Sequence, residues 1–228
     1  MQFEDLNWMD VESYLKQDDR VVLITGACEQ HAYLSLLTDI RTPVAIARVA
    51  CQREHVLIAP PLPYGVSPYF TAYPGTISLG AETFAAVVRE VLAGLLRQGF
   101  RRVLVSNGHG GNTGVLRPLL IEFNTGRPGA TLALFEWWRH PNVVAVAEEA
   151  GLAQYHANWS ESFPFTRVGE VPEGEKAPPD LPRIAPAEAF REALGDGSFG
   201  GAYTAPEAVS ERLFDAAVEA MVAALQEL

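Results

Sequence analysis

Short, uninterrupted apolar runs alternate with helical patterns through the first two thirds of the chain, and this alternation limits the possible folds most. Each run is typical of a strand buried on both faces, and the runs cover residues 20–25, 56–59, 101–106 and 130–135. Strand–helix units joined by short links predict a parallel, right-handed sheet with helices on both faces. We therefore expect a three-layer α/β/α fold with a mainly parallel central sheet.

The helical patterns lie between and after these runs. Residues 81–98 place apolar side chains every three or four positions and are followed by Gly99, which predicts an amphipathic helix packed on the sheet. Thr38 and Asp39 are expected to cap the helix after the first strand. The expected helices cover residues 41–52, 81–98, 113–124, 141–151, 187–194 and 206–228.

Two segments are expected to be loops. Residues 60–79 are rich in proline and aromatic side chains, and long loops of this kind often line a site. Residues 171–186 hold prolines at 172, 178, 179, 182 and 186 and predict an exposed connection. Because too little chain follows this connection for an independent core, we expect one domain over residues 1–228.

The composition narrows the function. The 228 residues are 48% hydrophobic and 20% charged, as in ordinary soluble enzymes. A formal charge of −11 without a basic cluster argues against nucleic acid and membrane surfaces as partners. No basic leader or long apolar run is visible, so a cytoplasmic protein is expected. Cys28 and Cys51 are too few for a disulfide framework, and Cys28 is either a reactive thiol or a small buried hydrophobe.

Acidic residues and histidines follow two of the predicted strands. Glu29 and His31 project the same way from the end of the first strand, and Asp39 can fold back onto them. His109 follows the third strand, between glycines. Ligands of parallel sheets bind beyond the carboxyl ends of the strands, so we expect these side chains to converge. The pattern predicts a metal site.

Two other kinds of site fit the glycine-rich turn less well. A dinucleotide fingerprint starting at Gly108 would need glycine at position 113, which is threonine. A nucleophile elbow around Ser106 would need glycine at position 104, which is leucine. His55 precedes a strand and His140 precedes a proline, so both are expected to be structural.

Four motifs, in this order, resemble the creatininase (creatinine amidohydrolase) family. They are Glu29-x-His31 with Asp39, Gly75-Thr76-Ile77, the turn Asn107-Gly108-His109-Gly110-Gly111-Asn112, and His156-Ala157 followed by Glu161-Ser162. The resemblance covers residues 18–165. It implies a three-layer α/β/α fold, two divalent metal ions per subunit, hydrolysis of a non-peptide or small amide C–N bond, and a homo-oligomer, commonly a hexamer.

The same resemblance implies residue roles. It matches His156 with the catalytic histidine of the family. It also matches four metal ligands, which are Glu29, His31, Asp39 and His109, with Asp39 shared between the two ions. Oxygen and nitrogen ligands suit Zn, Mn or Fe. Tyr73, Asn112 and Trp159 are expected to contact the substrate.

The chain departs from the family pattern at two positions. Creatininase proper has a glutamate, a metal ligand, where this chain has Gly111, and many relatives have a glutamate where Trp159 stands. Both changes argue against creatinine itself and leave formyl amides and modified peptides as alternatives. Without a glutamate at position 111, the ion bound by His31 and Asp39 has only two protein ligands. Glu161 is expected to complete this site and to act with the catalytic histidine.

The sequence therefore predicts a metal-dependent amidohydrolase. The alternative is a metal-bearing binding or regulatory protein of the same fold that has lost catalysis, because Trp159 replaces a family acid. Tyr64, Tyr69, Phe70 and Tyr73 would expose much aromatic surface on a small monomer. We expect them to meet another subunit or the substrate.

Overall fold

A four-stranded sheet forms the centre of the computed structural model, which describes residues 1–181 and 184–228. Its strands are β1 (Arg20–Thr25), β2 (Leu57–Ile58), β3 (Arg102–Asn107) and β4 (Thr131–Phe135), in the order β2-β1-β3-β4. All pairings within this sheet are parallel. The order of the strands reverses between β1 and β3, which is where ligands bind in open α/β sheets.

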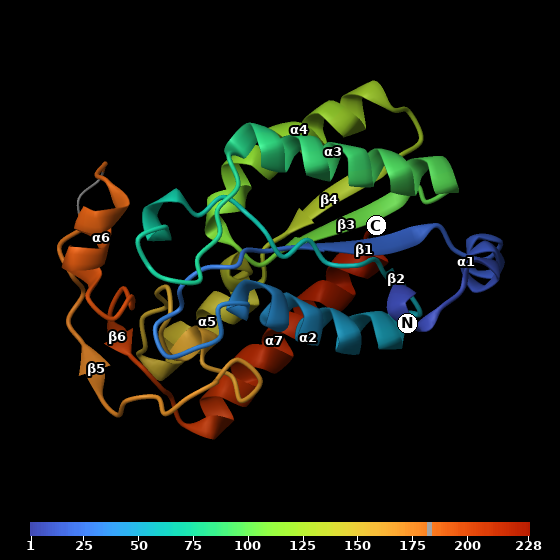
Figure 1. Cartoon of the computed structure of the whole chain (residues 1–228). Helices are drawn as coiled ribbons and strands as arrows, with labels where there is room; N and C mark the ends of the chain where they lie inside the picture. The colour runs from blue at the N-terminus through green and yellow to red at the C-terminus, as the bar shows by residue number, and fades with distance from the viewer. Residues whose placement is uncertain (182–183) are drawn as a thin grey trace.

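Helices cover both faces of the sheet, as Figure 1 shows. On one face lie α3 (Ala81–Gln98) and α4 (Thr113–Gly126). On the other face lie α2 (Thr38–Glu54), α5 (Pro141–Ala150) and α7 (Glu207–Gln226), while α1 (Trp8–Leu15) precedes β1. The predicted three-layer α/β/α architecture with a parallel sheet is confirmed.

The central strands are apolar throughout because both of their faces are buried. Val22 and Ile24 join a hydrophobic cluster with α2, α5 and α7, whereas Val21 and Leu23 join a second cluster with α3 and α4. Alternate side chains of a strand point to opposite faces, so each strand contributes to both clusters. The strands are thereby held rigidly, and the loops at their carboxyl ends start from fixed positions.

The start of α2 differs from the prediction. The helix begins at Thr38, and no side chain caps its first turn. The hydroxyl of Thr38 donates to the carbonyl oxygen of Ser35 at 2.7 Å, and the Asp39 carboxylate faces two histidines. The predicted capping role of these residues was wrong, because both side chains are engaged elsewhere. By contrast, α3 has the predicted ends, with Gly99 in the left-handed conformation at its C-cap.

The C-terminal third returns to the carboxyl ends of the strands. It contains a small antiparallel pair, β5 (Glu175–Lys176) and β6 (Gly201–Ala202), and the helix α6 (Ala187–Leu194). The predicted connection over residues 171–186 thus includes β5, and its proline at 182 lies outside the described residues. Short 3-10 turns are η1 (Phe3–Asp5), η2 (Pro68–Phe70), η3 (Gly110–Asn112), η4 (Trp137–Arg139) and η5 (Trp159–Glu161). Among the described helices, none is long and apolar enough to span a bilayer.

Candidate metal centre

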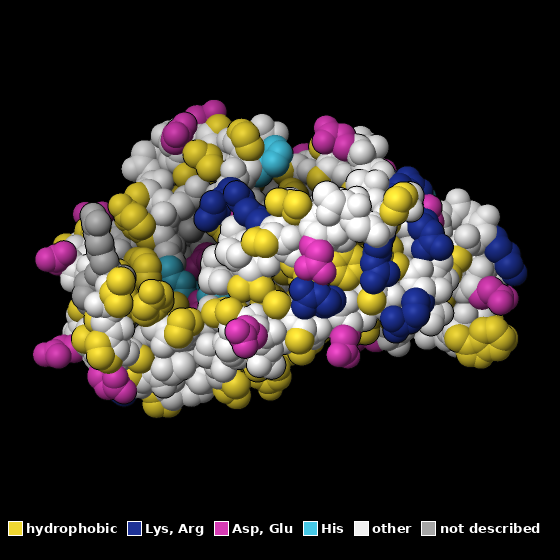
Figure 2. Space-filling model, turned by 90° about the horizontal axis from the view of Figure 1, so that it is seen from above, with side chains coloured by type: hydrophobic (Ala, Val, Ile, Leu, Met, Phe, Trp, Pro, Cys, Tyr) yellow, Lys and Arg dark blue, Asp and Glu magenta, His cyan; other side chains and the backbone are white. Residues whose placement is uncertain are grey.

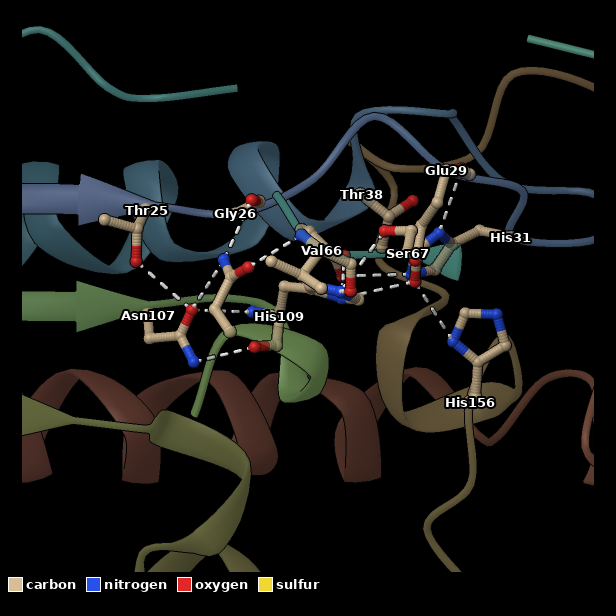
Figure 3. Close-up of polar contacts among 12 residues, drawn as sticks. Thr25, Gly26, Glu29, His31, Thr38, Val66, Ser67, Asn107, His109 and His156 are labelled. Atoms are coloured by element: carbon tan, nitrogen blue, oxygen red, sulfur yellow. Dashed lines mark hydrogen bonds and ion pairs between the residues drawn. The ribbon is translucent and has the colours of Figure 1, made fainter. Parts of the chain in front are cut away.

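Three loops bring acidic residues and histidines together beyond the ends of β1 and β3. Glu29 and His31 lie in the connection from β1 to α2, Asp39 lies in the first turn of α2, and His109 precedes the turn η3. Figure 3 shows Glu29 and His31 turned toward the histidine ring of His156, which comes from the loop after α5. The convergence predicted from the sequence is present.

Asp39 lies between two histidines. Its Oδ1 is 3.0 Å from Nε2 of His31, and its Oδ2 is 3.0 Å from Nδ1 of His109. The two oxygens of one buried carboxylate therefore face separate nitrogen atoms. A carboxylate shared by two ions would present its oxygens in the same way.

The side chains form compact groups of metal-ligand type. Within each group, the candidate ligand atoms lie within 4.8 Å of one another. One group joins Glu29 and His109 to Asp39, and a second joins His31 and Glu161 to the same Asp39. The structure therefore places Glu161 where the sequence required a further acid. A third group combines Glu29, His31 and His156.

Backbone carbonyl groups orient two of the histidines. The Nδ1 atom of His31 lies 3.3 Å from the carbonyl oxygen of Glu29, and Nε2 of His109 lies 2.9 Å from that of Val66. If each of these nitrogens donates its hydrogen, the other ring nitrogen carries a lone pair toward Asp39. Hydrogen bonds of this kind commonly orient metal-bound histidines.

Asn107, at the end of β3, holds the turn that carries His109. Its Oδ1 accepts from the hydroxyl of Thr25 at 3.1 Å and from the backbone N–H of His109 at 3.2 Å. Its Nδ2 donates to the carbonyl oxygen of His109 at 2.7 Å and to Glu136 at 3.1 Å. Because the Asn107 side chain is fully buried, these bonds fix the histidine relative to β1.

The residues fit divalent cations. Glu29, His31 and Asp39 are at most 4% exposed, and Oε2 of Glu29, Nε2 of His31 and Oδ2 of Asp39 are buried without a well-directed hydrogen bond in the described structure. Buried polar atoms are rarely left in this state, since each costs free energy. Three such atoms on neighbouring side chains are what the ligand atoms of a metal centre would leave unpaired.

The pKa values of His31 and His109 show that this cluster of carboxylates favours positive charge. Burial would lower the pKa of His31, but Asp39 and Glu161 raise it to about 10. Burial would also lower the pKa of His109, but the carboxylates of Glu29 and Asp39 outweigh this effect and raise it well above its usual value. Burial raises the pKa of Glu161 to about 7 despite the nearby His31. Divalent ions would replace the histidine protons in neutralising the cluster.

A cavity of about 480 Å³ opens beside the carboxylates. Aromatic side chains form much of its wall, including Phe70, Trp138, Tyr155 and Phe199. Apart from Tyr69 and Tyr155, its titratable lining residues are acids and histidines, and no lysine or arginine of the described chain lines it. In the space-filling view of Figure 2, basic side chains lie mostly over the right-hand half, whereas hydrophobic side chains gather on the left with histidine among them.

Comparison with known proteins accounts for this arrangement. The family model described as creatinine amidohydrolase matches residues 4–225, which is nearly the whole chain. The chain belongs to the creatininase family. The recognition made from the sequence, and the fold that it implied, are confirmed.

Relatives within the family differ in activity. Creatinine amidohydrolase from Pseudomonas putida is 30% identical over 112 residues, 46% of this chain and 43% of that protein. Mycofactocin precursor peptide peptidase from Mycobacterium ulcerans is 36% identical over 107 residues, 42% of each chain. This chain therefore aligns with less than half of the length of either relative.

Solved creatininases share the fold. A crystal structure of creatinine amidohydrolase matches over 99% of this chain and 96% of its own, with a TM-score of 0.82 and 22% identity. Two others, designated Mn and Zn–Zn type, have TM-scores of 0.78 at 23% identity, over 99% of this chain and 97% of theirs.

The three residues predicted to contact the substrate, Tyr73, Asn112 and Trp159, do not line the cavity. Asn112 is fully buried. Its Nδ2 donates to the carbonyl oxygen of Gly26 and its Oδ1 accepts from the backbone N–H of Val66, both at 3.0 Å. Trp159 is 1% exposed, and its indole N–H donates to the Ala153 carbonyl at 2.8 Å. The Tyr73 hydroxyl lies 3.3 Å from the Gly195 carbonyl. Each of these side chains is directed at backbone partners and away from this cavity, so its substrate contact stays a prediction.

Other predicted residues have structural positions. His55 ends α2 in the left-handed conformation, and Nδ1 of His140 accepts from the backbone at the start of α5, as their structural assignment requires. Cys28 lies outside the main cavity, with Sγ 3.4 Å from the Gly75 carbonyl oxygen. Burial and the charge of Glu29 raise the pKa of this thiol, which disfavours a thiolate nucleophile.

Sequence reasoning missed several residues of the site. Gln30 stands within the Glu29-x-His31 motif and could have been noticed there, since it contacts His156. Phe70, expected to meet another subunit or the substrate, lines the cavity, but its burial and its stacking on His156, with centroids 4.8 Å apart, were not predicted. Phe199 arrives from the C-terminal glycine-rich turn, and no local pattern indicates that it lines the cavity.

Proposed function

We propose that this chain is a metal-dependent hydrolase that cleaves the C–N bond of a small amide, using two divalent ions per subunit. The observation that carries the proposal is the placement of Asp39, whose two carboxylate oxygens each lie 3.0 Å from a different histidine. A carboxylate shared in this way, with buried acids on both sides, supports a pair of ions.

In this proposal each ion has three protein ligands. Glu29, Asp39 and His109 hold one, and His31, Asp39 and Glu161 hold the other. The ligand atoms are nitrogen and oxygen, which suits Zn, Mn or Fe. The chemistry that such ions supply is polarisation of a carbonyl group and a lowering of the pKa of water to about 7.

His156 is the proton carrier in this proposal. Its ring packs against both Phe70 and Phe199, with centroids 4.8 and 5.0 Å away, and its Nδ1 is 3.8 Å from Oε1 of Glu29. The ring thus faces both the carboxylates and the cavity. Transfer of a proton to the leaving nitrogen by a positioned side chain typically contributes about 10²- to 10⁴-fold in rate.

The cavity favours substrates without phosphate or other strong negative charge. No lysine or arginine of the described residues lines it, so apart from the proposed ions it offers no cation that would hold a phosphate group. Its volume of about 480 Å³ lies in the range of sites for drug-sized ligands. We therefore favour neutral amides, including formyl amides and short modified peptides, over phosphorylated nucleotides. The peptide peptidase among the relatives supports a substrate of this size.

The alternative of an inactive binding protein loses its motivation. It rested on Trp159, which replaces a family acid. Because this side chain lies in the hydrophobic core and not on the cavity, its identity does not alter the cluster of candidate ligands. The proposal also includes one domain over residues 1–228, supported by the packing of α7 on α2 and α5.

The test combines metal analysis with a substrate screen. Protein purified without chelator is analysed for metals and then incubated with small cyclic amides, formamides and short peptides. We expect two ions per subunit and turnover of at least one amide class, abolished by chelator and restored by Zn or Mn. Two ions without any turnover would favour the binding protein, and no bound metal would overturn both readings.

A further inference from the structure

Gln30 lies between two candidate ligands in the sequence but points away from them. Its side chain is buried, with 5% of the residue exposed. Its Oε1 accepts from the backbone N–H of Ala32 at 3.1 Å, and its Nε2 donates to the carbonyl oxygen of Gly197 at 3.1 Å. These two backbone partners distinguish the oxygen of the amide from its nitrogen, so the orientation of the amide is fixed.

The second hydrogen of this amide nitrogen is directed at His156. Nε2 of Gln30 lies 2.9 Å from Nε2 of His156, and the backbone carbonyl oxygen of Gln30 lies 3.1 Å from the same ring nitrogen. The ring nitrogen can accept from the amide or donate to the carbonyl, but a neutral ring cannot do both. The tautomer of His156 therefore depends on which contact is made.

The cost of an unpaired group decides between the two contacts. If Nε2 of His156 carried its hydrogen, a buried N–H of Gln30 would face another N–H and have no acceptor. If Nε2 accepts, the group that loses this partner is instead the backbone carbonyl oxygen of Gln30. Orphaned buried N–H groups are rarer than under-satisfied carbonyl groups. The amide contact is therefore the favoured one.

We infer that Gln30 is a positioning residue that holds neutral His156 with its proton on Nδ1. This nitrogen lies on the side of the ring that faces Glu29, 3.8 Å from Oε1. A protonated Nδ1 cannot ligate an ion, so the group Glu29, His31 and His156 is not a third metal site. Under the proposed function, on which this step rests, Nδ1 is the ring nitrogen on the side of the reacting groups.

The C-terminal segment completes the arrangement through Gly197. This glycine has φ of +101°, and a Cβ atom there would lie 1.8 Å from Oε1 of Gln30. Only glycine lets the carbonyl group approach the amide in this conformation. The glycine-rich turn thus contributes both Phe199, which packs on His156, and the acceptor that orients Gln30.

The tautomer can be measured directly in protein labelled with ¹⁵N-histidine. We expect the NMR signals of His156, assigned by comparison with His156→Gln, to show a protonated Nδ1 and an unprotonated Nε2, in both the metal-free and the Zn-loaded protein. In Gln30→Glu, a carboxylate replaces the amide donor, so the proton should move to Nε2. Gln30→Met removes the donor without adding charge and should give the same reversal.

Gln52→Glu is the matched control, because it makes the same change of charge on the exposed surface of α2. It should leave the proton on Nδ1. On any amide that the screen shows to be turned over, Gln30→Glu should lower kcat about 10²- to 10⁴-fold with KM and metal content unchanged. A proton on Nε2 in the unmodified protein, or on Nδ1 in both Gln30 variants, would overturn the inference whether or not the chain is a hydrolase.

Discussion

A Cβ atom at Gly111 would lie 2.4 Å from Nε2 of His109. It would also lie 2.2 Å from the carbonyl oxygen of Val66, which is 2.9 Å from the same ring nitrogen. The turn therefore has no room for any side chain at this position, including the glutamate of creatininase proper. The acid that joins Asp39 beside His31 is instead Glu161, on a different loop.

Gly111→Ala should disrupt the ion site formed by Glu29, Asp39 and His109. The added methyl group must displace either the histidine ring or the loop that carries Val66, and overpacking of this kind costs about 1–3 kcal/mol. We expect metal content to fall from two ions per subunit toward one. Gly110→Ala is the control, because a Cβ atom there meets nothing within 4 Å. Equal metal content in both variants would contradict the steric argument.

Glu161→Gln should remove the ion that His31, Asp39 and Glu161 are proposed to hold. Oε2 of Glu161 lies 3.8 Å from Nε2 of His31, and the substitution keeps the size of the side chain while it removes the charge. An ion left with His31 and Asp39 as its only protein ligands would bind weakly. Elemental analysis should show metal falling from two ions toward one, and turnover should be lost with the melting temperature of the metal-free protein unchanged.

Glu170→Gln makes the same change of charge at an exposed position and should leave both ions in place. If Glu161→Gln retains two ions and near wild-type activity, Glu161 is not a ligand. The second site would then be built from other groups.

The fold and the carboxylate–histidine cluster could be predicted because their signals are local. The apolar run of Arg20–Thr25 marks a buried strand, and the polar residues that follow must lie at its carboxyl end. The turn at His109 starts from the neighbouring strand, so the topology alone brings it to Glu29. Short-range pattern and sheet geometry were sufficient for this part.

The cavity wall could not be predicted in the same way. Phe199 and Gly197 reach the site through a segment that follows a proline-rich connection, and nothing in their local sequence indicates where that segment packs. Trp159 was placed at the site because it replaces a family acid, yet its indole ring is long enough to reach the hydrophobic core. Side-chain direction after a turn depends on tertiary packing, which the sequence pattern does not contain.

Trp159→Phe should weaken the fold without altering the metal centre. The substitution removes the hydrogen bond from the indole N–H to the Ala153 carbonyl and part of a buried ring. We expect the free energy of unfolding to fall by about 1–3 kcal/mol in urea titrations of the metal-free protein. Metal content and KM for any active amide should stay unchanged. A changed KM with unchanged stability would instead return Trp159 to the substrate site.

Self-association is expected from apolar side chains that the structure leaves exposed. Tyr64 is 44% exposed beside a groove lined by Leu36 and Val168, which are 39% and 63% exposed. Light scattering at micromolar concentration should give a multiple of 24.8 kDa. Tyr64→Asp should lower that mass if this surface forms the contact, whereas Ile121→Asp on α4 should not. A mass of 24.8 kDa for the unmodified chain would contradict the predicted homo-oligomer.

Asp18 should make the stability of the fold depend on pH in acid. Burial would raise the pKa of this carboxyl group, but hydrogen bonds and the charge of Arg20, together with Arg102, hold it below its usual value. The Asp18 carboxylate lies 2.6 Å from Arg20 and 3.0 Å from Arg102, so it ties the start of β1 to β3. A carboxyl group with a lowered pKa stabilises the fold above its unfolded pKa of about 3.9.

This contribution should be complete near neutral pH and disappear as the pH falls from about 4 through the lower pKa of the folded state. Asp18→Asn removes the charge and should reduce the free energy of unfolding at pH 7 by about 1 kcal/mol, since the pair is partly screened by solvent. The difference between the two proteins in urea titrations should shrink progressively below about pH 4. A difference that stays constant down to about pH 2 would show that Asp18 acts through packing and not through its charge.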